Sequence, residues 1–360
     1  MSEVLPLAEA SDTSLFGSKA VGLGEAIREG LPVPPGFALA GAIVEAVASE
    51  DEAAIARVVA AVATLPTPLA VRSSAVDEDG KAASFAGQHL TLLNVPKVDS
   101  VPGALREIWW SANSDSAITY RQRVGLLTQP SVGVVVQSLL DPEVAGVMFT
   151  ENPVTGADER VIEASWGLGE AVVAGLVIPD TFRIDRAGKV LERIPGLKRT
   201  AIRCRPDGGT CEEKIAKERA AALSLSGPQL AALHDLASRC EKVYGKARDI
   251  EWAIAGGKLF LLQCRAVTTS TSEKAAIDPT HVVAEHPAKV LPEVPLFAGL
   301  SEAQVEQIAA LFKARKFAAG EIVIREGSGG AAFYLVVSGE AKVTIRGEEV
   351  GTLRRGDHFG

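Results

Sequence analysis

The feature that most constrains the fold is a change in sequence character at about residue 268. Before it, short apolar segments alternate with glycine turns and helical stretches, a pattern typical of proteins that mix helices and sheets. Residues 269–290 have no clean periodicity and read as a linker. Residues 291–360 predict a short helix followed by alternating strands with glycine turns, the pattern of a small β-roll. We therefore expect a large domain over residues 1–268, a linker and a small β domain.

Composition narrows the range of partners. The chain has 360 residues, of which 47% are hydrophobic and 23% charged, a balance typical of globular proteins. Its net charge of −8 argues against nucleic acid as a partner, because binding a phosphate backbone requires a basic face. The sequence has no secretory signal at its start, and no apolar run is long enough to span a bilayer. We expect a cytoplasmic protein without a membrane or nucleic-acid partner.

The cysteines suggest no metal site. Cys204, Cys211, Cys240 and Cys264 form no CxxC pair, and no histidine lies beside them at metal-ligand spacing. We expect four reduced thiols. The alternative, a disulfide between Cys204 and Cys211, is disfavoured in a reducing compartment.

Periodicity and turn residues predict the main elements of the large domain. Residues 17–30 read as a glycine-rich turn that enters a helix, and the prolines after it require extended chain. Residues 69–73 predict a short buried strand. The other expected elements are a helix over 41–63, strands at 132–140 and 145–150 around the turn Asp141-Pro142, a strand at 160–165, a hairpin over 181–193, and one or two helices within 212–244.

A β-hairpin around the glycine turn at residues 256–257 carries the most suggestive polar residues. Asp249 and Glu251 are two residues apart and so share one face, with Gln263 and Arg265 on the partner strand. Two carboxylates and an amide suit Mg²⁺ that keeps water and phosphate as its other ligands, and Arg265 could neutralise phosphate charge. The alternative is a solvated strand face with a cross-strand ion pair.

The front of the chain offers groups suited to phosphate. Lys19 lies in a glycine-flanked turn before a helix, where its ammonium group can reach a phosphate. Arg72 lies at a strand exit and can contact phosphate oxygens through both branches of its guanidinium group. Residues 84–88 are small enough for backbone N–H groups to approach an anion. The structural alternatives are a surface lysine, an ion pair between Arg72 and a carboxylate such as Asp77, and an ordinary turn.

Five strings in a fixed order resemble the N-terminal nucleotide-binding domain of phosphoenolpyruvate synthase, pyruvate phosphate dikinase and rifampin phosphotransferase. They are GSKAVGLGEAIREGLPVPPGF (17–37), AVRSSAVDEDGKAASFAGQ (70–88), VVVQSLLDPEVAGVMFTENPVTG (134–156), VIEASWGLGEAVVAGLVIPD (161–180) and DIEWAI with LFLLQCRAVT (249–268). The resemblance covers nearly all of residues 15–268. It implies an α+β fold of the ATP-grasp type, in which two subdomains grip ATP between them, and an ATP-dependent phosphotransferase activity.

The resemblance also implies which residues bind ATP. The matching positions are Lys19, Arg72, Gly87, Thr91, Gln137, Leu139, Asp249, Glu251, Gln263 and Arg265. Lys19 and Arg72 would bind the phosphates, and Arg265 would contact the γ-phosphate. These three would be the catalytic residues. The loop around Gly87, together with Thr91, would cover the phosphates.

The remaining matched positions would hold the base and the metal. Gln137 and Leu139 would lie near the adenine at the hinge between the subdomains. Glu251 and Gln263 would hold Mg²⁺, with Asp249 close by. ATP and Mg²⁺ are therefore the ligands that the resemblance implies.

In this family a separate swivelling domain carries a histidine that accepts the phosphoryl group. The histidines of this chain are His89, His234, His281, His286 and His358, and none lies in the family's Thr-Ser-His-Ala motif. The resemblance therefore implies an acceptor histidine on a missing domain or a partner chain.

Residues 291–360 resemble the start of a cyclic nucleotide-binding domain through PLFAGLSE, AAGEIVIREG, FYLVVSGEAKV and GDHFG. The phosphate-binding cassette of that family would begin where the sequence stops, at Gly360. We therefore expect a partial β-roll, and a chain that is a fragment of a longer gene product or a degenerate remnant.

Three functions stay open at this point. The first is the phosphotransferase. The second is a non-catalytic ATP-binding regulatory protein whose tail senses cyclic nucleotide or contacts another protein. The third is a cyclic-nucleotide sensor in which ATP binding is vestigial.

Overall fold

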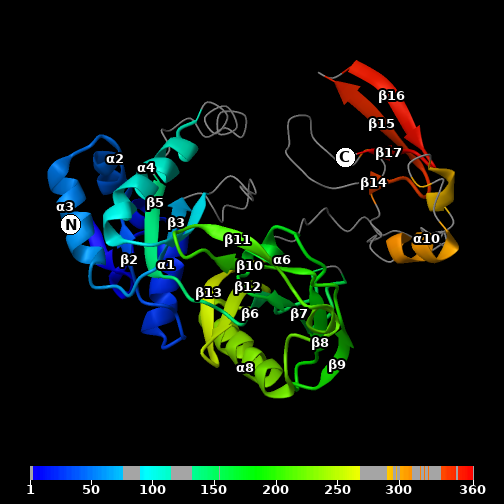
Figure 1. Ribbon diagram of the computed structural model, residues 1–360, viewed down its shortest axis with the longest axis horizontal. Coiled ribbons are helices and arrows are strands. Elements are labelled where there is room, and N and C mark those ends of the chain that lie inside the picture. Colours follow the sequence, from blue (N-terminus) through cyan, green and yellow to red (C-terminus); the bar gives the residue numbers. More distant parts are fainter. Residues whose placement is uncertain are drawn as a thin grey trace. The chain divides into compact units, whose positions relative to one another are not determined.

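The chain forms two compact units, Met1–Ser270 and Thr271–Gly360 (Figure 1). In the first unit, the computed structural model describes residues 3–75, 90–114, 132–153 and 155–267. In the second unit, it describes residues 290–294, 297, 301–309, 317, 320, 323, 334–345 and 348–359. The linker expected at 269–290 lies almost wholly outside these ranges, so its bounds stay a prediction.

The first unit begins with a five-stranded antiparallel sheet in the order β1-β2-β5-β3-β4. Its strands are β1 (Val4–Pro6), β2 (Gly36–Leu39), β3 (Leu69–Ala75), β4 (Thr91–Val95) and β5 (Val132–Ser138). Successive residues of β5 point to opposite faces, so Val134 and Val136 join one hydrophobic core while Val135 joins another. The sheet is therefore covered on both faces.

Helices supply both covers of this sheet (Figure 1). Helix α1 (Thr13–Arg28), with the short 3₁₀ helix η1 (Leu7–Glu9), packs on the Val135 face. Helices α2 (Gly41–Ala48), α3 (Glu52–Val62) and α4 (Val101–Ala112), the last preceded by the 3₁₀ helix η2 (Val98–Ser100), pack on the other face. The single helix expected over 41–63 is two helices. Asp51 begins the second by accepting a hydrogen bond from the backbone N–H of Ala54.

A second, six-stranded antiparallel sheet follows in the order β13-β12-β6-β7-β8-β9. Its strands are β6 (Val144–Phe149), β7 (Arg160–Trp166), β8 (Asp180–Ile184), β9 (Val190–Ile194), β12 (Arg248–Ala255) and β13 (Lys258–Ala266). The expected strands on either side of Asp141-Pro142 are β5 and β6, and they lie in different sheets. Residues 139–143 therefore cross from one sheet to the other.

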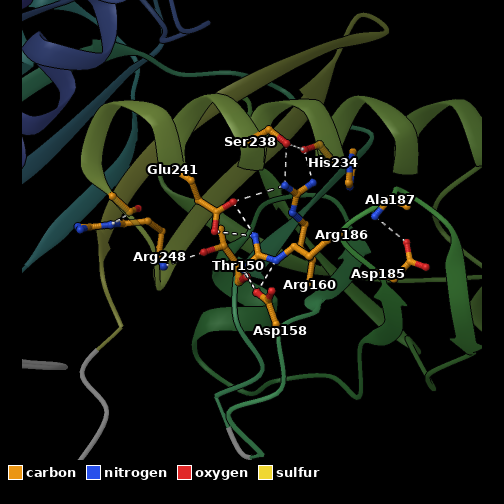
Figure 2. A network of polar contacts seen from close by, with 11 residues as sticks. Thr150, Asp158, Arg160, Asp185, Arg186, Ala187, His234, Ser238, Glu241 and Arg248 are labelled. Atoms are coloured by element: carbon orange, nitrogen blue, oxygen red, sulfur yellow. Dashed lines mark hydrogen bonds and ion pairs between the residues drawn. The ribbon is translucent and has the colours of Figure 1, made fainter.

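Helix α8 (Gly227–Tyr244) covers one face of the second sheet, where Trp252 and Phe182 are fully buried. Two arginines hold the helix in place (Figure 2). Arg160 on β7 donates to the backbone carbonyl of His234, and Arg186 after β8 donates to both carboxylate oxygens of Glu241 at 2.7 Å. With this face covered by α8, the opposite face of the sheet is the one that can carry a site.

A hairpin that the sequence analysis missed lies beside the second sheet. Strand β10 (Thr200–Cys204) pairs antiparallel with β11 (Thr210–Lys214) as a separate two-stranded sheet. The expectation of helix from residue 212 is therefore wrong at its start, because β11 is mostly exposed and charged and lacks the apolar alternation that marks a strand. Helical structure here begins with α7 (Lys217–Ala221), and the short helix α6 (Glu170–Val173) follows β7. All four cysteines are free thiols, as expected.

The second unit is rich in strands, as the sequence predicts. Strand β14 (Tyr334–Leu335) pairs with β17 (His358–Phe359), and β15 (Glu340–Ile345) pairs with β16 (Glu348–Arg354). The short helix is α10 (Glu302–Ala309), preceded by the 3₁₀ helix η3 (Leu291–Glu293). A small hydrophobic core joins Leu291, Val305 and Ala309. Across the described parts of both units, none of the helices combines the length and apolarity needed to cross a membrane.

A fully buried ion pair connects β8 to the segment after β9. The ammonium group of Lys198 contacts Asp180 Oδ1, and neither side chain has any exposed surface. Asp180 Oδ1 also accepts from the backbone N–H of Gly196 at 2.7 Å, and Oδ2 accepts from the N–H and the hydroxyl of Ser224 at 2.6 Å each. The buried carboxylate is thus surrounded by donors, which offsets the cost of removing its charge from water.

We predict that Asp180→Ala lowers the free energy of unfolding by about 3–5 kcal/mol, because the charge of Lys198 stays buried without its partner. Replacing both residues, as Asp180→Leu with Lys198→Met, should recover only part of the loss, because it removes the buried charge but leaves the donors of Gly196 and Ser224 without their acceptor. Urea unfolding followed by tryptophan fluorescence measures the change. The control is Glu3→Ala, which breaks an exposed pair with Arg57 and should have little effect. Equal losses in Asp180→Ala and the control would contradict the prediction.

Candidate nucleotide-binding site

The two sheets of the first unit meet at Arg72. From β3 of the first sheet, its Nη2 donates to Glu251 Oε2 at 3.1 Å and to Gln263 Oε1 at 3.0 Å in the second. Its Nη1 donates to the carbonyl of Leu262 at 2.7 Å. The side chains of Arg72 and Glu251 are 12% and 23% exposed, so the pair is largely shielded from water. A cation of one sheet therefore contacts oxygen donors of the other.

The hairpin β12–β13 forms as the sequence predicts, with an unpredicted β-bulge between Glu251 and Trp252 that shifts its register. Asp249 lies opposite Arg265, and Glu251 lies opposite Gln263. The carboxylate of Asp249 accepts from Arg265 Nε at 2.8 Å. Burial raises the pKa of the Asp249 carboxyl, and the neighbouring Arg265 guanidinium acts in the opposite direction.

One buried oxygen of this hairpin has no hydrogen-bond partner among the residues with described positions. Asp249 Oδ1 is buried and accepts no hydrogen bond from any residue that the structure describes. A buried acceptor in this condition is uncommon, and a cation or a bound donor would satisfy it. Groups of three or more His, Cys, Asp or Glu side chains placed to hold a metal are absent from the described ranges.

Lys19, on α1, contacts strand β3, the strand that carries Arg72. The helix is interrupted at Gly17, which has φ +78°. A Cβ atom there would lie 1.9 Å from the carbonyl oxygen of Ser74, so only glycine allows α1 to approach β3 this closely. Lys19 is buried, and its Nζ donates to the carbonyl of Ser73 at 2.8 Å. The ammonium group therefore lies one residue along the backbone from Arg72.

The residues expected near adenine lie where the chain leaves the first sheet. Gln137 of β5 is almost fully buried, and its Nε2 donates to the carbonyl of Pro34 at 3.0 Å. Leu139 begins the crossing segment, where its N–H donates to the carbonyl of Pro68 at 2.8 Å. Its side chain packs against a small hydrophobic core that includes Leu168, which follows β7 of the second sheet. Both residues thus lie at the junction between the sheets.

Two further expectations concern the residues that would cover the phosphates, Gly87 and Thr91, and the ion pair of Arg72 with Asp77. Thr91 is exposed and lies opposite Arg72 in the register of β4 and β3. Gly87 and Asp77 lie outside the described residues, and the carboxylate that Arg72 contacts is Glu251. A further polar group of this strand, not predicted from the sequence, is Ser73, whose buried hydroxyl has no hydrogen-bond partner within the described ranges. Its position directly after Arg72 is the only feature of the sequence that points to it.

Further hydrogen bonds hold α1 against helix α8, which covers the second sheet. The hydroxyl of Tyr244, at the end of α8, donates to the carbonyl of Gly22 in α1 at 2.7 Å. Arg239 of α8 donates to the carbonyl of Gly30, just after α1, at 2.6 Å. The helix that carries Lys19 is therefore anchored to β3 of the first sheet and to α8.

Two sheets that meet at a cluster of three cations, two carboxylates and an amide define a module suited to binding a polyphosphate. Comparison with known families also points to a nucleotide-binding module. The family described as "Pyruvate phosphate dikinase, AMP/ATP-binding domain" matches residues 41–286, and the chain belongs to this family. The family described as "Cyclic nucleotide-binding domain" matches residues 314–360. Both resemblances seen in the sequence are thereby confirmed, as is the mixed α+β fold.

Similar proteins carry phosphotransferase names. A probable phosphoenolpyruvate synthase of Methanothermobacter thermautotrophicus is 33% identical over 362 residues, covering 87% of this chain and 52% of that protein. A second one, from Archaeoglobus fulgidus, is 42% identical over 57% of this chain and 28% of that protein. The rifampicin phosphotransferase of Bacillus cereus is 37% identical over 56% of this chain and 23% of that protein. The chain thus spans about half the length of the first relative and less of the others.

Among solved structures, the D-alanyl-alanine synthetase A of Vibrio cholerae is 11% identical, with a TM-score of 0.33 over 73% of this chain and 59% of that chain. This likeness is too slight to carry an argument about the site.

We predict that Tyr244→Phe changes how the free energy of unfolding depends on pH in the alkaline range. Burial raises the pKa of the Tyr244 hydroxyl, so the folded state keeps this proton to higher pH than the unfolded state does. The protonated Tyr244 hydroxyl therefore contributes its full stabilisation of the folded state below the unfolded-state pKa of about 10, and this contribution is lost as the pH rises further. Wild type should therefore lose more stability than Tyr244→Phe between pH of about 9 and 11.

Urea unfolding at several pH values measures this difference. At pH 7 the variant should be less stable by about 1 kcal/mol, the value of the lost hydrogen bond to Gly22. Parallel curves for the two proteins across the alkaline range would contradict the assignment.

Proposed function

We propose that residues 1–268 bind ATP with Mg²⁺ and transfer the γ-phosphoryl group to a histidine on another domain or a partner chain. The observation that carries the proposal is the contact of Arg72 with Glu251 and Gln263, beside Lys19. Phosphoryl transfer depends mainly on positioning and on neutralising charge, and this cluster supplies cations and oxygen donors at one place.

In this proposal the cations bind the polyphosphate. Lys19 provides a compact point charge, and the guanidinium of Arg72 can contact two phosphate oxygens at once. Arg265 contacts the γ-phosphate from the hairpin. Thr91, with the loop around Gly87, covers the phosphates and excludes water. The roles of Lys19, Arg72, Arg265 and Thr91 rest on the family membership and on their positions, and the role of the loop around Gly87 rests on the family alone.

The other end of the nucleotide lies at the crossing between the sheets. Gln137 and Leu139 are placed there by the end of β5, so we assign the adenine to this junction. Because the chain passes from one sheet to the other at residues 139–143, a base bound here touches both halves of the module.

The donor set fits Mg²⁺. Glu251 and Gln263 would hold the ion through a carboxylate and an amide oxygen, which are hard ligands of the kind that Mg²⁺ prefers. The buried Asp249 Oδ1 is an acceptor without a donor among the described residues, which supports a cation nearby. When bound, the metal supplies neutralisation of the phosphate charge.

The acceptor is proposed from the family alone. In the relatives the matching region is only part of a longer protein. A histidine borne by another domain, as the resemblance implies, would receive the phosphoryl group and pass it on. The final acceptor would be chosen by groups outside these 360 residues.

One observation favours a second function. The match of residues 314–360 to the cyclic nucleotide-binding family supports a tail that senses a cyclic nucleotide, and so a regulatory protein. In this second proposal ATP binds without turnover. The two proposals differ in whether bound ATP is consumed.

We predict that the protein binds ATP in the presence of Mg²⁺, and that Arg72→Met and Glu251→Gln each weaken this binding. The expected loss is about ten- to a hundredfold, because each change removes charge-assisted interactions with the phosphates or the metal. Isothermal titration calorimetry measures the Kd. Matched controls are Arg57→Met and Glu192→Gln, which alter exposed ion pairs elsewhere and should leave the Kd unchanged.

A turnover assay separates the two functions. With the histidine-bearing domain of a family member supplied as acceptor, radiolabelled ATP should label that domain in the presence of wild type, and Arg265→Ala should lose this transfer. Tight ATP binding without any transfer to the supplied domain would select the regulatory protein. Failure of wild type to bind ATP would reject both proposals.

A further inference from the structure

The hairpin β10–β11 connects parts of the first unit that are far apart in the sequence. The carbonyl of Ile202 on β10 accepts from the backbone N–H of Leu168, next to the end of β7. Arg203 donates to the carbonyl of Pro142 in the crossing segment at 2.8 Å. Side chains of Ile202, Leu168 and Leu139 share one small hydrophobic core. The base of the hairpin is therefore anchored to the second sheet and to the crossing.

The tip of the hairpin is held by Asn94, which belongs to the first sheet. Asn94 lies near the end of the edge strand β4 and is 4% exposed. Its Nδ2 donates to the carbonyls of Arg205 and Gly209, both at 2.7 Å. Its own carbonyl accepts from the N–H of Gly209 at 3.0 Å. These three hydrogen bonds attach the turn between β10 and β11 to β4.

Asparagine suits this position for two reasons. Its backbone has φ +59°, a conformation that asparagine adopts more readily than most other residues with a side chain. Its amide also has two N–H donors, and each one meets a carbonyl oxygen. Aspartate has nearly the same shape and would present only acceptors to those oxygens.

The hydrogen bonds of Asn94 hold β4, the strand that pairs with β3 beside Arg72. Thr91 is the residue of β4 that lies opposite Arg72, and Asn94 follows it by three positions. A continuous path of hydrogen bonds thus runs from β4 through Asn94 and the hairpin to the second sheet. It joins the two sheets independently of the direct contact between Arg72 and Glu251.

We propose that Asn94 is a positioning residue for nucleotide binding: by tying β4 to the hairpin β10–β11, it fixes the two sheets at the separation that the nucleotide requires. The proposal rests on the ATP-binding function proposed above. It assigns no contact between Asn94 and the nucleotide itself.

The test uses Asn94→Asp and Asn94→Gly in the full chain. Both remove the two donated hydrogen bonds, while glycine keeps the positive φ and adds no charge. We expect each variant to bind a non-hydrolysable ATP analogue with Mg²⁺ about tenfold more weakly in calorimetry. The control is Asn113→Asp, which loses a comparable bond to the carbonyl of Trp109 at the end of α4 and should keep the wild-type Kd.

Hydrogen–deuterium exchange separates positioning from general destabilisation. In wild type, the nucleotide should slow exchange in residues 200–214 as well as in the hairpin β12–β13. In both Asn94 variants, the nucleotide at saturating concentration should still protect β12–β13 and no longer protect 200–214. A purely structural role would lower the melting temperature and leave this pattern unchanged, which would overturn the proposal.

Two other outcomes are decisive. Binding that neither Asn94 variant weakens would overturn this proposal alone, and so would a loss seen only with aspartate, because that loss would reflect charge repulsion. Failure of wild type to bind the analogue would overturn the ATP-binding function, and this proposal with it.

Discussion

The organisation of the first unit depends on one guanidinium group that joins two sheets. Arg72 is largely buried and therefore requires partners, which the second sheet supplies as a carboxylate, an amide oxygen and a backbone carbonyl. Each partner lies on the hairpin β12–β13, so the contact sets that hairpin against β3. The approach of α1, which brings in Lys19, is possible because Gly17 has no side chain.

The site is bounded by connections of different kinds. Residues 139–143 join the sheets covalently, Arg72 joins them electrostatically, and Asn94 joins them through the hairpin β10–β11. Packing completes the arrangement, because α8 covers the far face of the second sheet and leaves the face with Asp249 and Glu251 toward the first. A polyphosphate bound between the sheets would meet charge from both.

Local patterns predicted much of this arrangement. The period of two in β12 placed Asp249 and Glu251 on one face. The glycine turn alone would set Glu251 opposite Leu262, and a β-bulge beside Glu251 shifts the register so that Gln263 and Arg265 lie opposite the two carboxylates. The same reasoning was wrong where the pattern was weak. Residues 212–214 form a strand with mostly exposed, charged side chains, so nothing in their periodicity distinguished them from a helix start.

Other features depended on contacts between distant segments. The turn Asp141-Pro142 reads like a hairpin, yet β5 and β6 belong to different sheets because each finds its partners elsewhere in the chain. The carboxylate partner of Arg72 is Glu251, 179 residues away, and no local pattern indicates such a pairing. The three bonds of Asn94 reach more than a hundred residues along the chain.

The sequence by itself determined the family, the strand that presents Arg72 and the strand face that carries Asp249 and Glu251. These follow from motif order and from the fixed geometry of a strand, which are local properties. The tertiary structure alone decided which cation meets which carboxylate, how closely α1 approaches β3, and that Asn94 connects two sheets. Those features arise from packing between segments far apart in the chain, where burial and unmet hydrogen-bonding groups, rather than local propensity, select the partner.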